Sequence, residues 1–318
     1  TSGRICEELD KMGIPYVRVA ETNVVGLIDT GRPGKTIAVR GDIDALPVHE
    51  EANVPFKSEI DGCMHACGHD THAAMLLGTA RILSEHKEEL SGKIYLCFQK
   101  GEEIGHGARD IVNYLKEQGG VDKAFGLHIA ASLPLGLISL NEGPAMAGAC
   151  KWTLKVRGKG GHGSMPAASI DPIKPLAEIL LRITSLLVNR MDTLEPVVVS
   201  PCMFHAGTAD NIIPETAEMA GTIRYFKEEA LDKTLALIAD IADKIAASYG
   251  ATAEFTYSRG DTIPVVNEPA AIAVARKVAG EVEGLTPIET PKMMGSDNFA
   301  DFVHAFPGFY AFFGAGFD

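Results

Sequence analysis

Features typical of membrane proteins and nucleic-acid-binding proteins are absent from this sequence. No apolar run approaches the roughly 20 residues that a membrane-spanning helix requires. Lys and Arg number 29 against 42 Asp and Glu, a formal net charge of -13, and there is no basic tract. Because phosphate contacts supply most of the affinity for nucleic acids, and anionic lipids attract basic segments, we expect neither a nucleic-acid nor a membrane partner.

Cysteine is also sparse. Six Cys in 318 residues are too few for a disulfide framework in a chain of this length. Residues 1–8 contain no apolar core of the kind that a signal peptide has. We therefore expect reduced thiols and a cytoplasmic location.

The length predicts two domains at roughly 150 residues per domain. In the first part of the chain, buried-type apolar strands alternate with amphipathic helices, a pattern that favours an α/β sheet covered by helices. The strands are expected at residues 24–28, 36–40, 93–98 and 124–129, and the helices at 70–90 and 107–118.

The pattern changes near residue 148 to strands with alternating apolar and polar residues, which is typical of an antiparallel sheet with one solvated face. From about residue 262 the chain returns to a helix and an apolar strand. We predict a catalytic α/β domain with a mixed, largely parallel sheet, made of residues 1–147 plus 259–318. An α+β lid or dimerisation domain, residues 148–258, interrupts it.

The densest polar cluster is MHACGHDTH at residues 64–72, with three His, one Cys and one Asp just before a predicted helix. Thiolate and imidazole are good ligands for zinc and similar ions, and a turn lets Cys67 and His69 converge. Two alternatives are a metal-independent loop in which Asp70 caps the helix, and a nucleophilic Cys67 with His69 as its partner. The second would leave the acidic pair described next without a role.

Glu102 and Glu103 directly follow a predicted buried strand, and His128 follows another. The carboxyl ends of parallel strands are where α/β proteins form ligand sites. One carboxylate of the pair could bind a metal while the other takes a proton from a water molecule. The alternatives are a solvated acidic surface and a buried structural His.

With these motifs in order along nearly the whole chain, the sequence resembles the M20 metallopeptidases. Within that family it is similar to the amidohydrolase branch of aminoacylases, hippurate hydrolases and auxin-conjugate hydrolases. The matching stretches are residues 40–47 (RGDIDALP), 64–72, 98–99 (FQ) with 102–103 (EE), 126–128 (GLH), 160–166 (GGHGSMP), 207–214 (GTADNIIP) and 221–224 (GTIR).

The resemblance implies two divalent metal ions, with Cys67 as a shared ligand and His69, Glu103 and His128 as further ligands. Glu102 would be the general base and acid. A thiolate ligand favours a softer ion, such as Zn, Mn, Ni or Co, over Mg.

The resemblance also implies that residues of the inserted domain act on the substrate. His162 would help to stabilise the oxyanion, and in relatives this His comes from the partner subunit of a homodimer. Asn211 and Arg224 would orient the substrate, with the guanidinium as a two-pronged clamp for a carboxylate. The alternatives are a flexible hairpin around His162 and a surface salt bridge at Arg224.

Three departures from the family pattern stand out. Lys100 and Gly101 replace the usual Pro-Ala before the acidic pair, and residues 295–299 (GSDNF) replace Gly-Ser-Glu-Asp-Phe in the region that lines the acyl or amine pocket. The family's last metal ligand is a His after the Gly-Ala-Gly turn of residues 314–316, where the given sequence ends. We therefore expect the protein to continue beyond Asp318; His304 would be a substitute ligand.

The sequence thus predicts hydrolysis of N-acyl amino acids to a carboxylate and a free amino acid. Alternatives with the same chemistry are a dipeptidase or carboxypeptidase and an N-acetyl-diaminopimelate deacetylase. A catalytically silent metal-binding scaffold is a further alternative, but a scaffold would not need the base Glu102.

Overall fold

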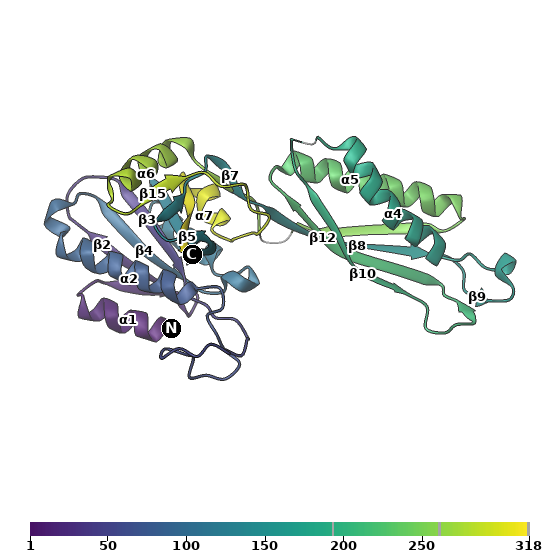
Figure 1. The fold of residues 1–318 in the computed structure, drawn as a ribbon, viewed down its shortest axis with the longest axis horizontal. Helices are drawn as coiled ribbons and strands as arrows, with labels where there is room; N and C mark the ends of the chain where they lie inside the picture. Colours follow the sequence, from purple (N-terminus) through teal and green to yellow (C-terminus); the bar gives the residue numbers. More distant parts are fainter. Residues whose placement is uncertain (193, 260–261, 317–318) are drawn as a thin grey trace. The chain divides into compact units, whose positions relative to one another are not determined.

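The computed structural model describes residues 1–192, 194–259 and 262–316 (Figure 1). In this described part, the chain divides into two compact units, each with its own sheet. The first unit comprises Thr1–Met146, Val265–Met293 and Asp297–Asp318, and the second comprises Ala147–Pro264 and Met294–Ser296. The second unit is therefore an insertion into the first.

The first unit is built on a mixed sheet that contains eight strands within the described residues, in the order β1-β2-β4-β3-β5-β16-β6-β15. The neighbours β4, β3, β5 and β16 run parallel, while β1, β2 and β6 add antiparallel pairings. This confirms the predicted α/β class and the mixed sheet. The strands are β1 (Tyr16–Val19), β2 (Asn23–Asp29), β3 (Thr36–Asp42), β4 (Lys93–Gln99), β5 (Lys123–Pro134), β6 (Leu137–Ser139), β15 (Thr286–Ile288) and β16 (Gly308–Gly316).

Helices cover this sheet because their apolar stripes need a partner surface. Helices α1 (Ser2–Lys11) and α2 (His69–Glu85) pack against each other and against β2, β3 and β4. Their shared core contains Leu9, Leu76 and Leu96, all buried. The unit also contains α3 (Ala108–Glu117), α6 (Pro269–Glu281), α7 (Ala300–Ala305), the 3-10 turns η1 (Lys87–Glu89) and η2 (Glu102–Ile104), and the small β-pair of β7 (Gly143–Met146) and β14 (Val265–Asn267).

The second unit has an antiparallel sheet in which the described strands follow the order β10-β12-β8-β13. Alternate residues of β8 and β12 are buried, and Trp152 lies in the core beneath two helices. This agrees with the alternating sequence pattern. The elements are β8 (Gly148–Arg157), β9 (Gly161–His162), η3 (Pro166–Ala168), α4 (Ile173–Arg190), β10 (Val198–Ala206), β11 (Ile212–Ile213), β12 (Thr216–Tyr225), α5 (Glu228–Ser248) and β13 (Thr252–Ser258).

The strand order of the first unit decides which side chains share a site. Because β4, β3 and β5 are parallel neighbours, their carboxyl ends meet at one edge of the sheet. Asp42 ends β3, the Glu102 turn follows β4, and His128 lies in the middle of β5. That edge is the expected position of a ligand site. Among the helices of the described residues, none has the length and apolar character to cross a membrane.

Candidate metal centre and hydrolytic site

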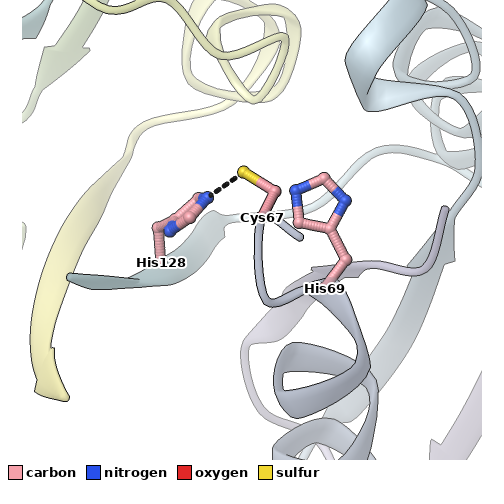
Figure 2. Close-up of side chains that lie close together, drawn as sticks. All are labelled: Cys67, His69 and His128. Atoms are coloured by element: carbon pink, nitrogen blue, oxygen red, sulfur yellow. Dashed lines mark hydrogen bonds between the residues drawn. The ribbon is translucent and has the colours of Figure 1, made fainter. Parts of the chain in front are cut away.

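Cys67, His69 and His128 form the centre of the site at this edge (Figure 2). One ligand atom from each lies within 4.8 Å of the others. The Cys67 thiol lies between the two imidazole rings, with Sγ 3.4 Å from Nε2 of His128. A second group joins His69 to Glu102 and Glu103 under the same distance limit. The fold therefore brings together all five residues that the sequence singled out in this domain.

A tight turn places Cys67 and His69 on the same side. Gly68 adopts φ +89°, a left-handed conformation that costs glycine nothing. A Cβ at this position would also lie 2.4 Å from Cδ1 of Ile129 on β5. His69 is the first residue of α2, so the turn directs the thiol and the imidazole to one place before the helix begins.

The protonation state of His128 suits a ligand. Its Nδ1–H donates to the carbonyl of Ile129 at 2.6 Å, which leaves the lone pair of Nε2 facing Cys67. Burial, followed by the charge of His72, lowers the pKa of His128. The ring is therefore neutral, as a metal ligand must be.

His69 shows that the site favours a cation. Its Nε2 is buried and has no hydrogen-bond partner among the described residues, although Asp42 Oδ2 lies 3.6 Å away and Glu103 Oε1 lies 3.9 Å away. Burial lowers the pKa of His69, but hydrogen bonds to Asp44 and Cys67 outweigh it and raise the pKa to about 11. A thiol, imidazoles and carboxylates around an unpaired nitrogen fit a divalent ion.

A buried charge network lies behind this centre, and sequence reasoning gave it no role. Arg40 pairs with Asp42 at 2.7 Å and with Asp297 at 3.2 Å, and these side chains are at most 2% exposed. Asp42 also bonds Nδ1 of His72 at 2.5 Å, and Asp297 accepts from the Tyr310 hydroxyl. One sequence feature could have pointed to this network: the stretch RGDIDALP places charged residues at the end of a predicted buried strand.

The same network affects Glu102. Burial, followed by the nearby charge of Asp297, raises the pKa of Glu102 to about 8. The backbone N–H of Asn298 lies 3.4 Å from its Oε1. Two Gly residues in left-handed conformation, Gly101 and Gly105, begin and end the turn that carries Glu102 and Glu103.

Asn23 holds both ends of the loop of residues 100–107, which carries Glu102 and Glu103. It is fully buried, its Oδ1 accepts from the Lys100 N–H at 2.7 Å, and its Nδ2 donates to the carbonyl of Gly107 at 3.1 Å. Sequence reasoning missed this residue, because it lies more than 70 positions away on β2.

In the second unit, the structure brings two of the predicted residues together. His162 on β9 pairs with Ile212 on β11, and the Gly163 N–H donates to the carbonyl of Asn211 at 2.8 Å. Both His162 and Asn211 are exposed. A Cβ at Gly163 would lie 3.0 Å from that carbonyl oxygen, so glycine permits this close pairing.

Arg224 lies on β12 and is half-buried. Its guanidinium donates to the Thr222 hydroxyl, and no carboxylate partner is found for it among the described residues. A guanidinium without an anion remains able to bind one.

Comparison with known proteins identifies the family. The family model "Peptidase family M20/M25/M40" matches residues 38–318. The chain belongs to this family. Its sequence is 41% identical to "Thermostable carboxypeptidase 2" of Saccharolobus solfataricus, over 99% of this chain and 80% of that protein. It is 37% identical to "N-acetylcysteine deacetylase" of Bacillus subtilis, over 97% of this chain and 80% of that protein.

A solved structure agrees with the M20 assignment. The YXEP protein of Bacillus subtilis, described as a dinuclear metal binding peptidase from M20 family, is 36% identical and superposes with a TM-score of 0.86. The match covers 98% of this chain and 82% of that chain. The predicted resemblance to M20 is thus confirmed, and with it the class of metal-binding hydrolases.

One departure from the M20 pattern now has a physical explanation. Asn298 stands where the family usually has Asp. Its Oδ1 accepts from Arg40 at 3.1 Å and from Gln99 at 2.7 Å, while its Nδ2 donates to the carbonyl of His106 at 3.0 Å. A carboxylate has no donor for the His106 carbonyl. The amide therefore ties the Glu102 loop to the Arg40 network.

Proposed function

We propose that the protein hydrolyses the amide bond of N-acyl amino acids. The observation that carries this proposal is the convergence of Cys67, His69, Glu103 and His128 beside a second carboxylate, Glu102, at the carboxyl edge of a parallel sheet. The names of the relatives support amide substrates, because one is a deacetylase of an N-acetylated amino acid.

Cys67, His69, Glu103 and His128 would hold two divalent ions. When bound, such ions polarise the amide carbonyl and lower the pKa of a water molecule. We propose Zn, Mn, Ni or Co rather than Mg, because the Cys67 thiolate is a soft ligand.

Glu102 would take the proton from the attacking water and return it to the leaving amine. Its carboxyl group is next to the ligand cluster, and within the described part of the chain it accepts one long contact, from the Asn298 N–H, so it remains available for this exchange. His162 would donate a hydrogen bond to the oxyanion. Arg224, with Asn211, would bind the free carboxylate of the amino acid.

The test combines metal analysis with substrate assays on the full-length protein. We expect about two divalent ions per chain and turnover of N-acetyl, N-benzoyl and other N-acyl amino acids. Removal of the ions with a chelator should abolish turnover, and one of the four metals should restore it. A metal-free protein that hydrolyses these substrates would contradict the proposal.

A carboxypeptidase is the second candidate, because the relative at 41% identity carries that name. The same assay should include N-blocked dipeptides and free dipeptides. Turnover of peptides at rates well above those of N-acyl amino acids would favour the carboxypeptidase.

We also propose a homodimer formed through the second unit. Helix α4 exposes Leu181 and Val188, which are 73% and 75% exposed, and the neighbouring β10 is an edge strand that exposes Val198 and Phe204. A second copy would cover this apolar face and pair with the open strand edge. Light scattering should give a dimer mass, and Leu181→Asp with Val188→Asp should give a monomer.

We infer that the protein acts in the cytoplasm. Each of the six Cys, all within the described residues, is a free thiol, which suits a reducing compartment.

A further inference from the structure

The loop after β9 makes an unusual contact with its own catalytic candidate. The backbone N–H of Ser164 donates to Nδ1 of His162 at 3.2 Å, and the Ser164 hydroxyl lies 2.8 Å from the same atom. The Met165 N–H donates to the His162 carbonyl at 2.9 Å and closes a tight turn around these groups. The turn therefore orients the N–H and the hydroxyl of Ser164 toward the same ring atom, Nδ1.

These contacts define the tautomer of the ring. A backbone N–H can only donate, so Nδ1 of His162 must accept. The single proton of the neutral ring then resides on Nε2, which makes Nε2–H a hydrogen-bond donor.

We propose that Ser164 is a positioning residue, which holds His162 as the neutral Nε2–H tautomer and fixes the direction of that N–H. The assignment deepens, and rests on, the proposed amide hydrolysis. In that reaction His162 acts as an electrophilic donor to the oxyanion and not as a base, because Nε2 already carries the proton. No proton leaves His162 during the reaction.

The surrounding loop supports a fixed orientation. Gly163 is held against Asn211 by the hydrogen bond of its N–H, and a Cβ at that position would make a tight contact with the Asn211 carbonyl oxygen, at 3.0 Å. The main chain on both sides of the His162 ring is thus tied, and the Ser164 contacts fix the ring itself. An exposed His without such contacts would sample both tautomers and several rotamers.

The first test measures the tautomer directly in the full chain, without substrate. The protein is labelled with 15N at its His rings, and the His162 signals are assigned by their loss in His162→Gln. We expect Nε2 protonated and Nδ1 unprotonated at neutral pH. Ser164→Ala loses the shorter contact, that of the hydroxyl at 2.8 Å, and keeps only the backbone N–H at 3.2 Å. With one donor left on Nδ1, the Nδ1–H tautomer should become detectable.

The second test measures turnover of an N-acyl amino acid. Ser164→Ala should lower kcat about tenfold, the effect of one lost hydrogen bond, with metal content and melting temperature unchanged. Ser164→Thr keeps a hydroxyl and should restore most of the loss. Ser169→Ala is the matched control, because the Ser169 hydroxyl lies in the same loop but bonds the Pro166 carbonyl.

A wild-type His162 that carries its proton on Nδ1, or on both nitrogens, would overturn the proposal. So would a Ser164→Ala variant with unchanged tautomer and unchanged kcat. If the wild-type protein hydrolyses no N-acyl amino acid, the proposed function fails; the NMR measurement then still decides whether Ser164 sets the tautomer.

Discussion

The ligand cluster of the first unit and the His162 hairpin of the second are held in place by different means. Around Cys67 and His69 lies a network in which Arg40 and Asp42 are fully buried and charged. His162 and Asn211 are exposed and are held by a two-residue strand pair and a turn. The first arrangement depends on charge balance in a dry interior, and the second on local backbone hydrogen bonds.

This difference predicts how each region responds to substitution. Removal of a buried charge leaves its partners unpaired in low dielectric, so stability changes together with activity. Removal of an exposed side chain leaves solvent in its place, so activity changes alone. Glu102 lies between the two cases, because it is half-buried but can be replaced by a neutral group of the same shape.

The largest effect is expected for Glu102→Gln. The amide cannot accept the proton, so kcat should fall by about 10² to 10⁴-fold. Gln keeps an oxygen for the Asn298 N–H, and the ligand atoms of Cys67, His69 and Glu103 are unchanged. Metal analysis should therefore show normal content, with Glu117→Gln on the exposed face of α3 as the control. Near-normal turnover would contradict the role of Glu102.

Arg40→Met should produce the largest loss of stability. The substitution leaves the buried carboxylates of Asp42 and Asp297 without their shared cation, which should lower the free energy of unfolding by about 3–5 kcal/mol. Urea titration measures this change. Arg81→Met removes an exposed pair with Glu85 and should cost less than about 1 kcal/mol. Equal losses in the two variants would contradict the conclusion that the ligand cluster depends on buried charge balance.

His162→Ala should lower kcat by about 10² to 10³-fold, the usual effect of one lost oxyanion donor. Because the side chain is exposed, the melting temperature should stay within the error of the measurement. The proposed dimer adds a second experiment. Subunits of His162→Ala mixed with those of Glu102→Gln should regain activity if each site uses both chains. If the subunits exchange but activity does not return, His162 serves the site of its own chain.

The smallest effect is expected for Arg224→Lys. An ammonium keeps the charge but loses the two-pronged geometry, so KM for N-acyl amino acids should rise about tenfold while kcat stays similar. Methyl esters of the same substrates lack the anion and should show no difference between wild type and variant. Arg157→Lys, whose pair with Glu254 is exposed, is the control. An equal rise of KM for the esters would exclude a carboxylate clamp.

Much of the first unit could be predicted because its signals are local. The continuous apolar stretch of β4 predicts a buried strand, and a strand of a parallel sheet ends where ligands collect. The position of Glu102 and Glu103 at this edge follows from those two facts, and His128 was predicted there because it follows another apolar stretch, in β5. The turn at Gly68 made the proximity of Cys67 and His69 predictable as well.

The Arg40 network could not be predicted in the same way. Arg40 and Asp297 are separated by more than 250 positions, and periodicity carries no information on which distant charges will meet. The contacts of Tyr310 with Asp297 and of Asn298 with Arg40 could not be predicted for the same reason. Their roles became visible only when β16 was placed beside β5, and the loop before α7 next to Arg40 of β3 and Gln99 of β4.

By itself, the sequence determined the local elements, the mixed α/β class, the inserted second unit and the types of side chain available for a hydrolytic metal site. Those properties depend on residue spacing and intrinsic chemistry, which act over a few positions. Only the tertiary structure decided that Asp42 and His72 stand behind the ligands, that Asn298 ties the Glu102 loop, and that Ser164 faces Nδ1 of His162. Sheet order and turn geometry set these contacts, and both depend on the folding of the whole unit.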